Sequence, residues 1–461
     1  MPEPVQRGQR YMPGLDGLRA IAVLGVILYH LGFGWAEGGL LGVGVFFTLS
    51  GYLITDILLN QASRGGIRLK SFWLARARRL LPALFVMLIV VMAWVTVIGP
   101  HQPSDFRAAA LSAAGYVNNW WLIFHDVSYF ARVAPPEPLN HLWSLSIEEQ
   151  FYIVWPFLLM LGIRLVPEVR FSTGVRFRLA GVTLALALLS GVLMVLLYRP
   201  SVDPSRVYYG TDTRALELLA GAALAMMWPS RRLRANVSPR ARAMIDGIGI
   251  AGLIVIAVMF WRVSEFSPFL YRGGFAVLSL ATVFAVASMA HPASRLGPIV
   301  GCSPMRWIGE RSYGIYLWHL PIIVLTTPES AHGPDALRAA LQVVATVAVA
   351  ELSWRYVENP IRHGALGRLW AELRSGAWGR ERITRPGWAV ASASLAVSTA
   401  AVAGLVGVGV SNEPSAIGSE TVAKTVKAKQ VRSGPFAASC DAVIHIGDST
   451  SEGLVSEEYL P

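Results

Sequence analysis

The run LLPALFVMLIVVMAWVTVIG at residues 80–99 decides the fold class. Its 20 residues carry no charged side chain, and 18 or more consecutive apolar residues are the signature of a transmembrane helix. A weaker run at 111–124 contains Asn118 and Asn119 and is expected to be interfacial or re-entrant. We expect an all-α polytopic membrane protein with about eleven transmembrane helices. The further runs lie at 15–32, 40–60, 147–163, 179–198, 212–228, 245–262, 271–290, 312–328, 337–356 and 387–410.

Composition supports a membrane protein and argues against nucleic-acid binding. Of the 461 residues, 54% are hydrophobic and 15% are charged, too few charges to cover a soluble protein of this length. The net charge is +11, but the basic residues form short clusters between apolar runs, as at 64–79 and 231–242. Such clusters are typical of cytosolic loops beside anionic membrane lipids. The two cysteines, Cys302 and Cys440, lack metal-site spacing, so we expect no metal and no disulfide.

Loops rich in Lys and Arg alternate with loops that are poor in them. The loop at 61–79 holds six basic residues and no acidic one, whereas Glu37 is the only charged residue of 33–39. Because positively charged loops stay in the cytosol, we expect the N-terminus to be cytosolic and the C-terminus extracytoplasmic. An odd number of spans agrees with this orientation.

The chain divides by composition into a long membrane part and a short polar end. After Pro414 the sequence becomes polar, and an apolar run at 442–446 then precedes Gly447, Asp448 and Ser449. This pattern favours a buried strand that ends in a tight turn, as in an extracytoplasmic α/β domain. The expected units are 1–365 (a transmembrane domain of about ten helices), 366–386 (a cytosolic basic loop), 387–410 (an additional transmembrane helix), 411–438 (a linker) and 439–461 (the start of the α/β domain).

The first span carries two ionisable residues, Arg19 and His30. A charge at the bilayer centre costs about 3 kcal/mol or more, so such residues are functional candidates. Eleven residues at about 100° each bring the two side chains within roughly 20° of one face, separated by about 16 Å along the axis. The alternative is a snorkelling arginine and a histidine that only packs.

At this point the sequence resembles a known family. The segment YMPGLDGLRAIAVLGVILYH at 11–30 is similar to the signature of the acyltransferase-3 family of membrane acyltransferases, in which ten residues separate an Arg from a His. The resemblance covers about 350 residues. It continues through GVGVFFTLSGYLIT at 42–55, RARRLLP at 76–82, HLWSLSIEEQFYIVWP at 141–156, TRALELLAGAALA at 213–225 and RSYGIYLWHLP at 311–321.

The resemblance implies a function and a location. It implies an O-acyltransferase of the bacterial plasma membrane that moves an acyl group from cytosolic acyl-CoA, either acetyl-CoA or succinyl-CoA. The acceptor would be a hydroxyl of an extracytoplasmic cell-envelope glycan or glycolipid. Acyl-CoA would act as a co-substrate, and no tightly bound cofactor is expected.

The resemblance also assigns roles to His30, Arg19 and Glu148. The family's essential histidine and motif arginine map onto His30 and Arg19. A neutral imidazole can remove a proton from an acceptor hydroxyl, although a transient acyl-histidine remains open. Glu148, expected near the outer edge of its span, could orient the imidazole as in a dyad. Alternatively, it is a carboxylate stabilised by the helix N-terminus.

Arg76, Arg78 and Arg79 form a basic cluster where a loop enters the third span. The Arg-x-x-Arg motif of the family appears here as Arg76 and Arg79. Guanidinium groups bind phosphates bidentately, so the phosphates of coenzyme A are the expected ligands. On charge alone, the cluster could equally be a determinant of topology. His319, inside the ninth predicted span, could line the donor tunnel or be a hydrogen-bonded packing residue.

Acceptor-side candidates are Asp212, Arg214 and Glu149. Asp212 and Arg214 could line the acceptor entrance or form an internal ion network, and Glu149 could face a polar partner. Ser449 lies in a Gly-Asp-Ser turn that resembles the first block of SGNH hydrolase-like domains, which are often fused to this family. Such a serine needs the later Asp-x-x-His of those domains, which these residues lack, so we expect a truncated domain in which Ser449 is not a complete site.

Two other classes of function compete with acyl transfer. A polytopic transporter or flippase of a lipid-linked or acylated substrate would also have many spans and buried charges. Against it, the two halves show no matching pair of helices broken by Gly or Pro. In the other class, the membrane part only anchors an extracytoplasmic enzyme.

Overall fold

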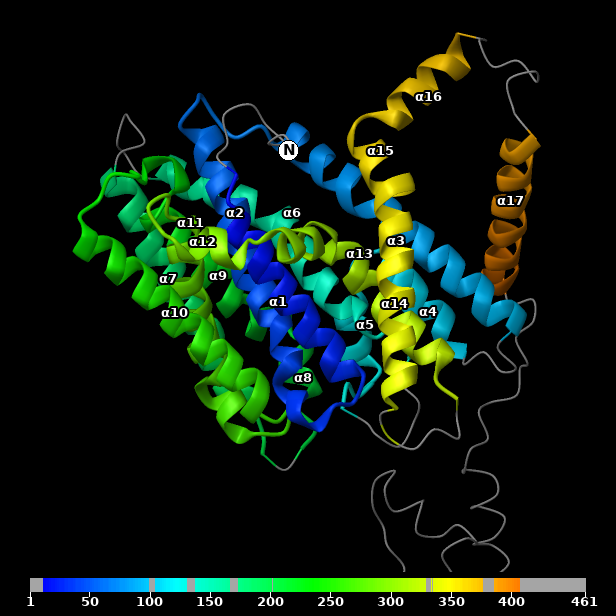
Figure 1. Ribbon diagram of the computed structural model, residues 1–461, viewed down its shortest axis with the longest axis horizontal. Helices are drawn as coiled ribbons and strands as arrows, with labels where there is room; N and C mark the ends of the chain where they lie inside the picture. Colours follow the sequence, from blue (N-terminus) through cyan, green and yellow to red (C-terminus); the bar gives the residue numbers. More distant parts are fainter. Residues whose placement is uncertain are drawn as a thin grey trace, which may run out of the picture.

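The computed structural model describes residues 11–98, 104–130, 137–165, 173–200, 202–328, 333, 335–375 and 385–406, and these residues form helices and loops without a strand (Figure 1). The predicted strand and Ser449 lie outside the described residues. The long helices are α1 Pro13–His30, α2 Gly42–Ala62, α3 Leu69–Ile98, α6 Leu142–Leu165, α7 Thr173–Leu197, α9 Thr211–Met227, α10 Pro239–Arg262, α11 Phe275–Ala290, α13 Ser303–Thr326, α14 Ala336–Ser353 and α17 Arg385–Val406.

Short helices connect or extend the long ones. They are η1 Gly34–Leu41, α4 Ser104–Ala114, α5 Asn118–Phe124, α8 Ser205–Tyr209, η2 Ser230–Arg232, η3 Leu270–Gly274, α12 Leu296–Val300, η4 Trp354–Glu358, α15 Asn359–Arg362 and α16 Ala365–Arg374. The expected basic loop at 366–386 therefore begins as a helix.

Each apolar run expected to span the membrane lies on a helix, but 6 helical stretches of the described chain are long and apolar enough to cross a bilayer. Four of the other runs coincide with α1, α6, α9 and α13, which carry ionisable residues among their apolar ones. The molecule is a multi-pass helical protein, and the count of about eleven spans stays a prediction. The 6 stretches are Gly34–Ala62, Leu69–Ile98, Thr173–Leu197, Pro239–Arg262, Leu270–Ala290 and Ala336–Arg362.

The weak run at 111–124 is divided between two short helices. The backbone reverses at Tyr116, whose φ of 54° lies in the left-handed region, and the chain then enters α5. Asn118 and Asn119 are buried at the start of α5. This segment is not one continuous span, in agreement with the sequence-based expectation.

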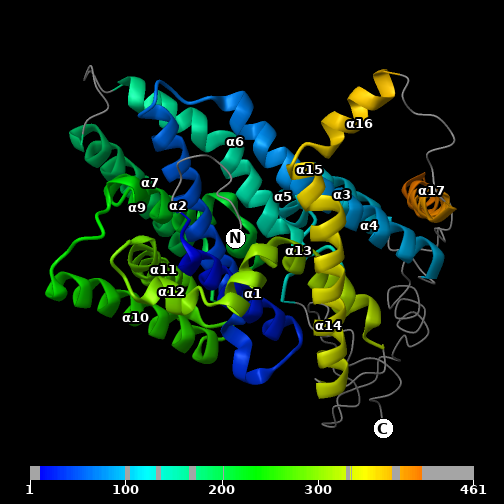
Figure 2. The same ribbon diagram turned by 45° about the horizontal axis from the view of Figure 1, so that its top comes forward.

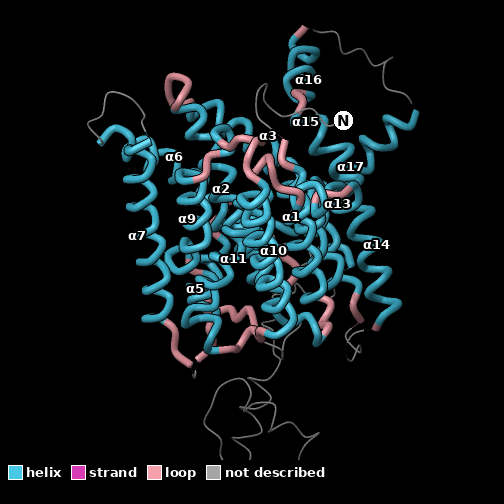
Figure 3. The backbone as a smooth tube through the Cα atoms, turned by 60° about the vertical axis from the view of Figure 1, so that its left-hand side comes forward, coloured by secondary structure: helices cyan, strands magenta, loops and turns pink. Residues whose placement is uncertain are grey.

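Helix α1 lies in the middle of the bundle, where it packs against α2, α11 and α13 (Figure 1; Figure 2). The loops gather at the two ends of the bundle (Figure 3). Close helix crossings require glycine: a Cβ on Gly309 would lie 1.9 Å from the carbonyl oxygen of Asp16, and one on Gly221 would lie 1.9 Å from that of Thr48. Small residues at these crossings bring α1 to α13 and α2 to α9.

Candidate active site

A first cavity, here called the arginine pocket, lies between α1, α2, α3, α6 and α13. Three arginines point into it from two helices, and a carboxylate and several hydroxyl groups complete its polar lining. Its polar residues are Arg19, Ser50, Arg76, Arg79, Ser144, Glu148, Tyr152, Ser312, Tyr313 and Tyr316.

The expected arginines meet in this pocket, with one exception. Arg19 on α1 and Arg76 and Arg79 on α3 line it together, whereas Arg78 is exposed and does not. A spacing of three residues puts Arg76 and Arg79 on one face of α3, and Arg78 is turned away from that face. The Arg76 guanidinium lies 5.5 Å from the ring centroid of Tyr152, close enough for a cation–π contact.

A tyrosine just before α1 belongs to the same end of the bundle as Arg19. The Tyr11 hydroxyl donates to the carboxylates of Asp16 at 2.8 Å and Glu310 at 3.2 Å. Partial burial and these two negative charges raise the pKa of Tyr11 above its ordinary value. Asp16 also lies 3.8 Å from Arg19. These contacts anchor the end of α1 that carries Arg19.

Glu148 is a member of the arginine pocket and not the partner of His30 that we expected. Its carboxylate accepts hydrogen bonds from Ser50 at 2.8 Å and from Tyr152 at 3.4 Å. The arginines of the pocket supply positive charge nearby, which offsets the cost of burying the Glu148 carboxylate. Glu149 is partly buried and lines neither this cavity nor the one that contains His30.

A second cavity, here called the histidine pocket, shares no lining residue with the first. His30, the last residue of α1, lines it, whereas Arg19 lies in the N-terminal half of that helix. Its polar lining is formed by Tyr29, His30, Glu37, Tyr129, Asn140 and Glu265.

The hydrogen bonds of His30 define its tautomer. The Nδ1 atom lies 2.9 Å from the carbonyl oxygen of Val26, which only accepts, so Nδ1 carries the proton of the neutral ring. The Nε2 atom then holds a lone pair and accepts a hydrogen bond from the Tyr129 hydroxyl at 3.0 Å. The basic nitrogen of His30 is therefore the one beside Tyr129, which lines the pocket with it.

His319 lies between the two cavities and lines neither of them. Its side chain is fully buried, and its Nε2 atom is 3.2 Å from Nδ1 of His30. Its Nδ1 atom is 2.6 Å from the carbonyl oxygen of Tyr316 and thus carries the proton. The position expected to line a donor tunnel is instead in contact with the imidazole of His30.

A series of polar side chains connects the two cavities. The Tyr316 and Ser144 hydroxyls lie 2.6 Å apart, and both residues line the arginine pocket. The ring of Tyr316 is 5.2 Å from that of His319, which contacts His30. The site therefore runs from the arginines through Tyr316 and His319 to His30.

The position of Tyr129 depends on contacts with α8 and with the residues just before it. Its backbone N–H donates to the Ser205 hydroxyl at 2.9 Å, and the neighbouring Ser128 hydroxyl donates to Asp203 at 2.5 Å. The ring of Tyr129 packs at 4.9 Å from that of Tyr208. These contacts hold the Tyr129 hydroxyl at the Nε2 atom of His30.

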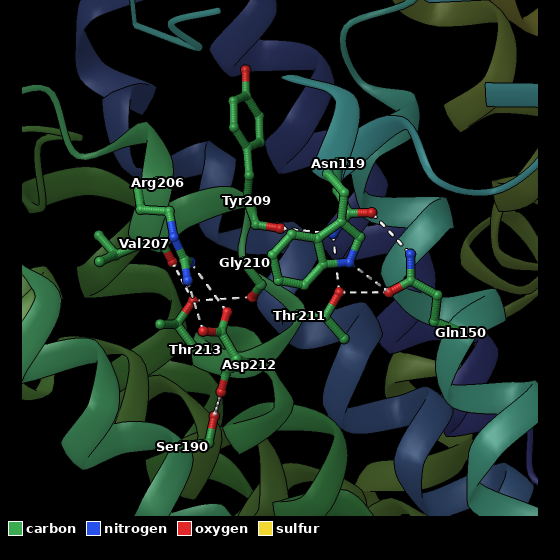
Figure 4. A network of polar contacts seen from close by, with 11 residues as sticks. Asn119, Gln150, Ser190, Arg206, Val207, Tyr209, Gly210, Thr211, Asp212 and Thr213 are labelled. Atoms are coloured by element: carbon green, nitrogen blue, oxygen red, sulfur yellow. Dashed lines mark hydrogen bonds and ion pairs between the residues drawn. The ribbon is translucent and has the colours of Figure 1, made fainter. Parts of the chain in front are cut away.

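Asp212 belongs to a polar network that fixes the turn between α8 and α9 (Figure 4). Both its carboxylate oxygens accept from Arg206, at 3.1 and 2.8 Å. Beside it, Thr211 donates to Gln150 at 2.6 Å, and Asn119 donates to the carbonyl of Tyr209 at 3.1 Å. Of the two interpretations left open for Asp212, the structure favours the internal network.

Arg214 forms a fully buried ion pair with Glu217, with 2.8 Å between Nη2 and Oε1. Aromatic rings surround its guanidinium, which lies 4.1 Å from the ring centroid of Phe275 and 5.0 Å from that of Tyr208. Arg214 therefore contacts Tyr208, against which Tyr129 packs, and does not line the histidine pocket.

Sequence reasoning missed Tyr129, Tyr316 and Ser50. Tyr316 and Ser50 lie within two of the sequence blocks that resemble the family. A hydroxyl group in an apolar run is common and does not by itself indicate a site. Tyr129 follows the short helix α5 in a segment without periodicity, and its role depends on contacts distant in sequence. Within the described residues, no group of three His, Cys, Asp or Glu residues could hold a metal ion.

Comparison with known proteins identifies the family of this chain. The model of a family described as an acyltransferase domain matches residues 12–355. The chain belongs to this family. The matched residues of this acyltransferase family include both cavities and the polar series between them.

Curated relatives of the acyltransferase family span more than this chain does. A peptidoglycan O-acetyltransferase of Listeria monocytogenes is 48% identical over 78% of this chain and 57% of its own length. A putative peptidoglycan O-acetyltransferase of Bacillus subtilis is 46% identical over 77% of this chain and 55% of its own length. An O-acetyltransferase of Staphylococcus aureus is 39% identical over 77% and 57%. The chain thus spans a little over half the length of these relatives. No solved structure matches it.

Proposed function

We propose that this chain is a transmembrane O-acyltransferase that moves an acyl group, with acetyl as the first candidate, from acyl-CoA to a hydroxyl of a cell-envelope glycan. The proposal rests on the basic Nε2 atom of His30 at the histidine pocket. Buried polar side chains connect this residue to the arginine pocket, which three arginines line. The relatives' names support acetyl transfer and a peptidoglycan acceptor.

The arginine pocket is the proposed donor site, facing the cytosol. Arg19, Arg76 and Arg79 converge there, and guanidinium groups suit the pyrophosphate and ribose phosphate of coenzyme A. Glu148 balances part of this charge and holds Ser50. The extended pantetheine arm would then direct the thioester toward Tyr316 and His319. This orientation follows from the basic residues at 61–79, a range that includes Arg76 and Arg79.

The histidine pocket is the proposed acceptor site, open to the extracytoplasmic side. An acceptor hydroxyl would take the place of the Tyr129 hydroxyl at Nε2 of His30. His30 then removes its proton as the oxygen attacks the thioester carbonyl, and the coenzyme A thiolate leaves with a proton. Acyl-histidine formation at the same atom is the alternative route.

The test uses the full chain in proteoliposomes with radiolabelled acetyl-CoA on one side and glycan fragments on the other. We expect label in the glycan with the wild type and at least a hundredfold lower rate with His30→Gln. The matched control is His125→Gln, because His125 is an exposed histidine that contacts neither cavity. Equal labelling by wild type and His30→Gln would refute the proposal.

The same vesicles discriminate against a transporter. A flippase would move an acylated substrate without new covalent label in the acceptor. The family match does not favour that alternative. Labelled glycan that appears only on the side opposite the donor supports transfer across the bilayer.

A further inference from the structure

We propose that His319 is the positioning and proton-sharing partner of His30, the role that a carboxylate fills in most histidine dyads. This inference rests on the proposed acyl transfer. It deepens the account of the same site by naming the group on which the reaction's proton resides.

The geometry of the two imidazoles sets the direction of proton sharing. The Nδ1 proton of His319 is bound to the Tyr316 carbonyl at 2.6 Å, so the Nε2 atom of His319 holds a lone pair. That lone pair faces the Nδ1–H of His30 at 3.2 Å. The single Nδ1 proton of His30 is therefore shared between the Val26 carbonyl and the Nε2 atom of His319.

No carboxylate takes this place among the described contacts of His30. Its ring nitrogens contact Val26, Tyr129 and His319, and Glu148 is bound elsewhere by Ser50. His319 is fully buried, which keeps solvent from competing for its Nε2 atom. A neutral imidazole in this position orients His30 and can also accept a proton, which a carbonyl oxygen does far less readily.

The proton then follows a balanced route. As the acceptor oxygen bonds to the thioester carbon, its proton passes to Nε2 of His30, while the Nδ1 proton of His30 moves to Nε2 of His319. The carbon–sulfur bond breaks and the thiolate leaves. The proton returns from His319 to Nδ1 of His30, and the Nε2 proton of His30 protonates the sulfur. One proton is taken from the acceptor and one is given to coenzyme A.

Two substitutions separate proton sharing from simple orientation. In His319→Gln, an amide oxygen near the former Nε2 position can accept from Nδ1 of His30 but cannot be protonated. His319→Ala removes both capabilities. The control is His141→Gln, because His141 is equally buried, packs 5.2 Å from the ring of His319 and donates only to the Leu317 carbonyl.

In the proteoliposome assay we expect His319→Gln to lower kcat at least tenfold, with the KM for acetyl-CoA within twofold of the wild type. His319→Ala should lower kcat about a hundredfold, and His141→Gln should stay within twofold. Wild-type kcat in His319→Gln would overturn the proposal. So would an equal loss in His141→Gln, because it would indicate a packing role.

A second readout does not need acyl transfer. In vesicles with ¹⁵N-labelled histidine, solid-state NMR resolves the tautomer of His30 by difference from His30→Gln. We expect an Nδ1–H tautomer whose Nδ1 resonance shifts in His319→Ala. An Nε2–H tautomer, or a resonance unchanged in His319→Ala, would overturn the inference. An inactive wild type with the expected resonances would count against the proposed function and leave the histidine pair supported.

Discussion

Glu217→Gln tests how strongly the buried ion pair behind the histidine pocket holds the fold together. Arg214 and Glu217 are both 0% exposed, and 2.8 Å separates their charged atoms. Removing one partner of a buried pair leaves an uncompensated charge and typically costs about 3–5 kcal/mol.

The aromatic surroundings decide which variant is the more damaging. In Glu217→Gln, the guanidinium keeps its ring contacts, the nearest at 4.1 Å to Phe275, and each such contact is worth roughly 0.5–2 kcal/mol. We therefore expect a loss of about 3 kcal/mol in unfolding free energy. Arg214→Met loses these contacts and also strands the Glu217 carboxylate, so the expected loss is about 4–5 kcal/mol. The double variant should recover most of this loss, because no unpaired charge remains.

The assay is unfolding of the purified chain in mixed micelles, followed by tryptophan fluorescence. Arg206→Met is the matched control, because Arg206 pairs with Asp212 at the same 2.8 Å but the two side chains are 40% and 30% exposed. Exposed pairs contribute at most about 1 kcal/mol. The reasoning is refuted if Glu217→Gln costs no more than Arg206→Met, or if the single losses simply add in the double variant.

Three further predictions address the site and its scaffold. Replacing Arg76 and Arg79 by Lys should raise the KM for acyl-CoA roughly tenfold or more, because bidentate phosphate contacts worth about 1.5–3 kcal/mol are lost. The control Arg78→Lys should leave that KM unchanged. Equal effects of the two changes in steady-state kinetics would contradict the assignment of the arginine pocket to acyl-CoA. Tyr129→Phe removes one hydrogen bond to His30, worth about 0.5–1.5 kcal/mol, and should change kcat by about two- to tenfold; an unchanged rate at saturating acceptor would show that the hydroxyl does not matter. Gly221→Leu should prevent α9 from reaching α2, because even a Cβ would lie 1.9 Å from a backbone oxygen; a folded variant with wild-type thermal stability would disprove this crossing.

The sequence predicted the long helices and the positions of two site residues along one of them. Apolar runs located the long helices, although several of these helices also carry ionisable residues. Helical spacing placed Arg19 and His30 on one helix at different depths, and the structure puts them at two separate cavities. Helical spacing is enough here because Arg19 and His30 both lie on α1.

Relations between helices were beyond the reach of the sequence. Glu148 was expected beside His30, but periodicity does not fix the depth of one helix relative to another, and α6 presents this carboxylate to the arginines. From the sequence, His319 could line a donor tunnel or be a hydrogen-bonded packing residue. Its contact with His30 depends on the crossing of α13 over α1. The glycine contact at that crossing, between Gly309 and Asp16, depends on a partner 293 positions away, and one sequence does not name that partner.

The two cavities share no lining residue, and the side chains that connect them are buried: His319 is 0% exposed and Tyr316 is 6% exposed. A continuous water-filled channel of this polarity would conduct ions and dissipate the voltage across the membrane. Closely packed imidazole and phenol groups permit short proton movements but offer no hydrated route for sodium or potassium. The proposed acyl transfer would therefore cross a bilayer that stays electrically insulating.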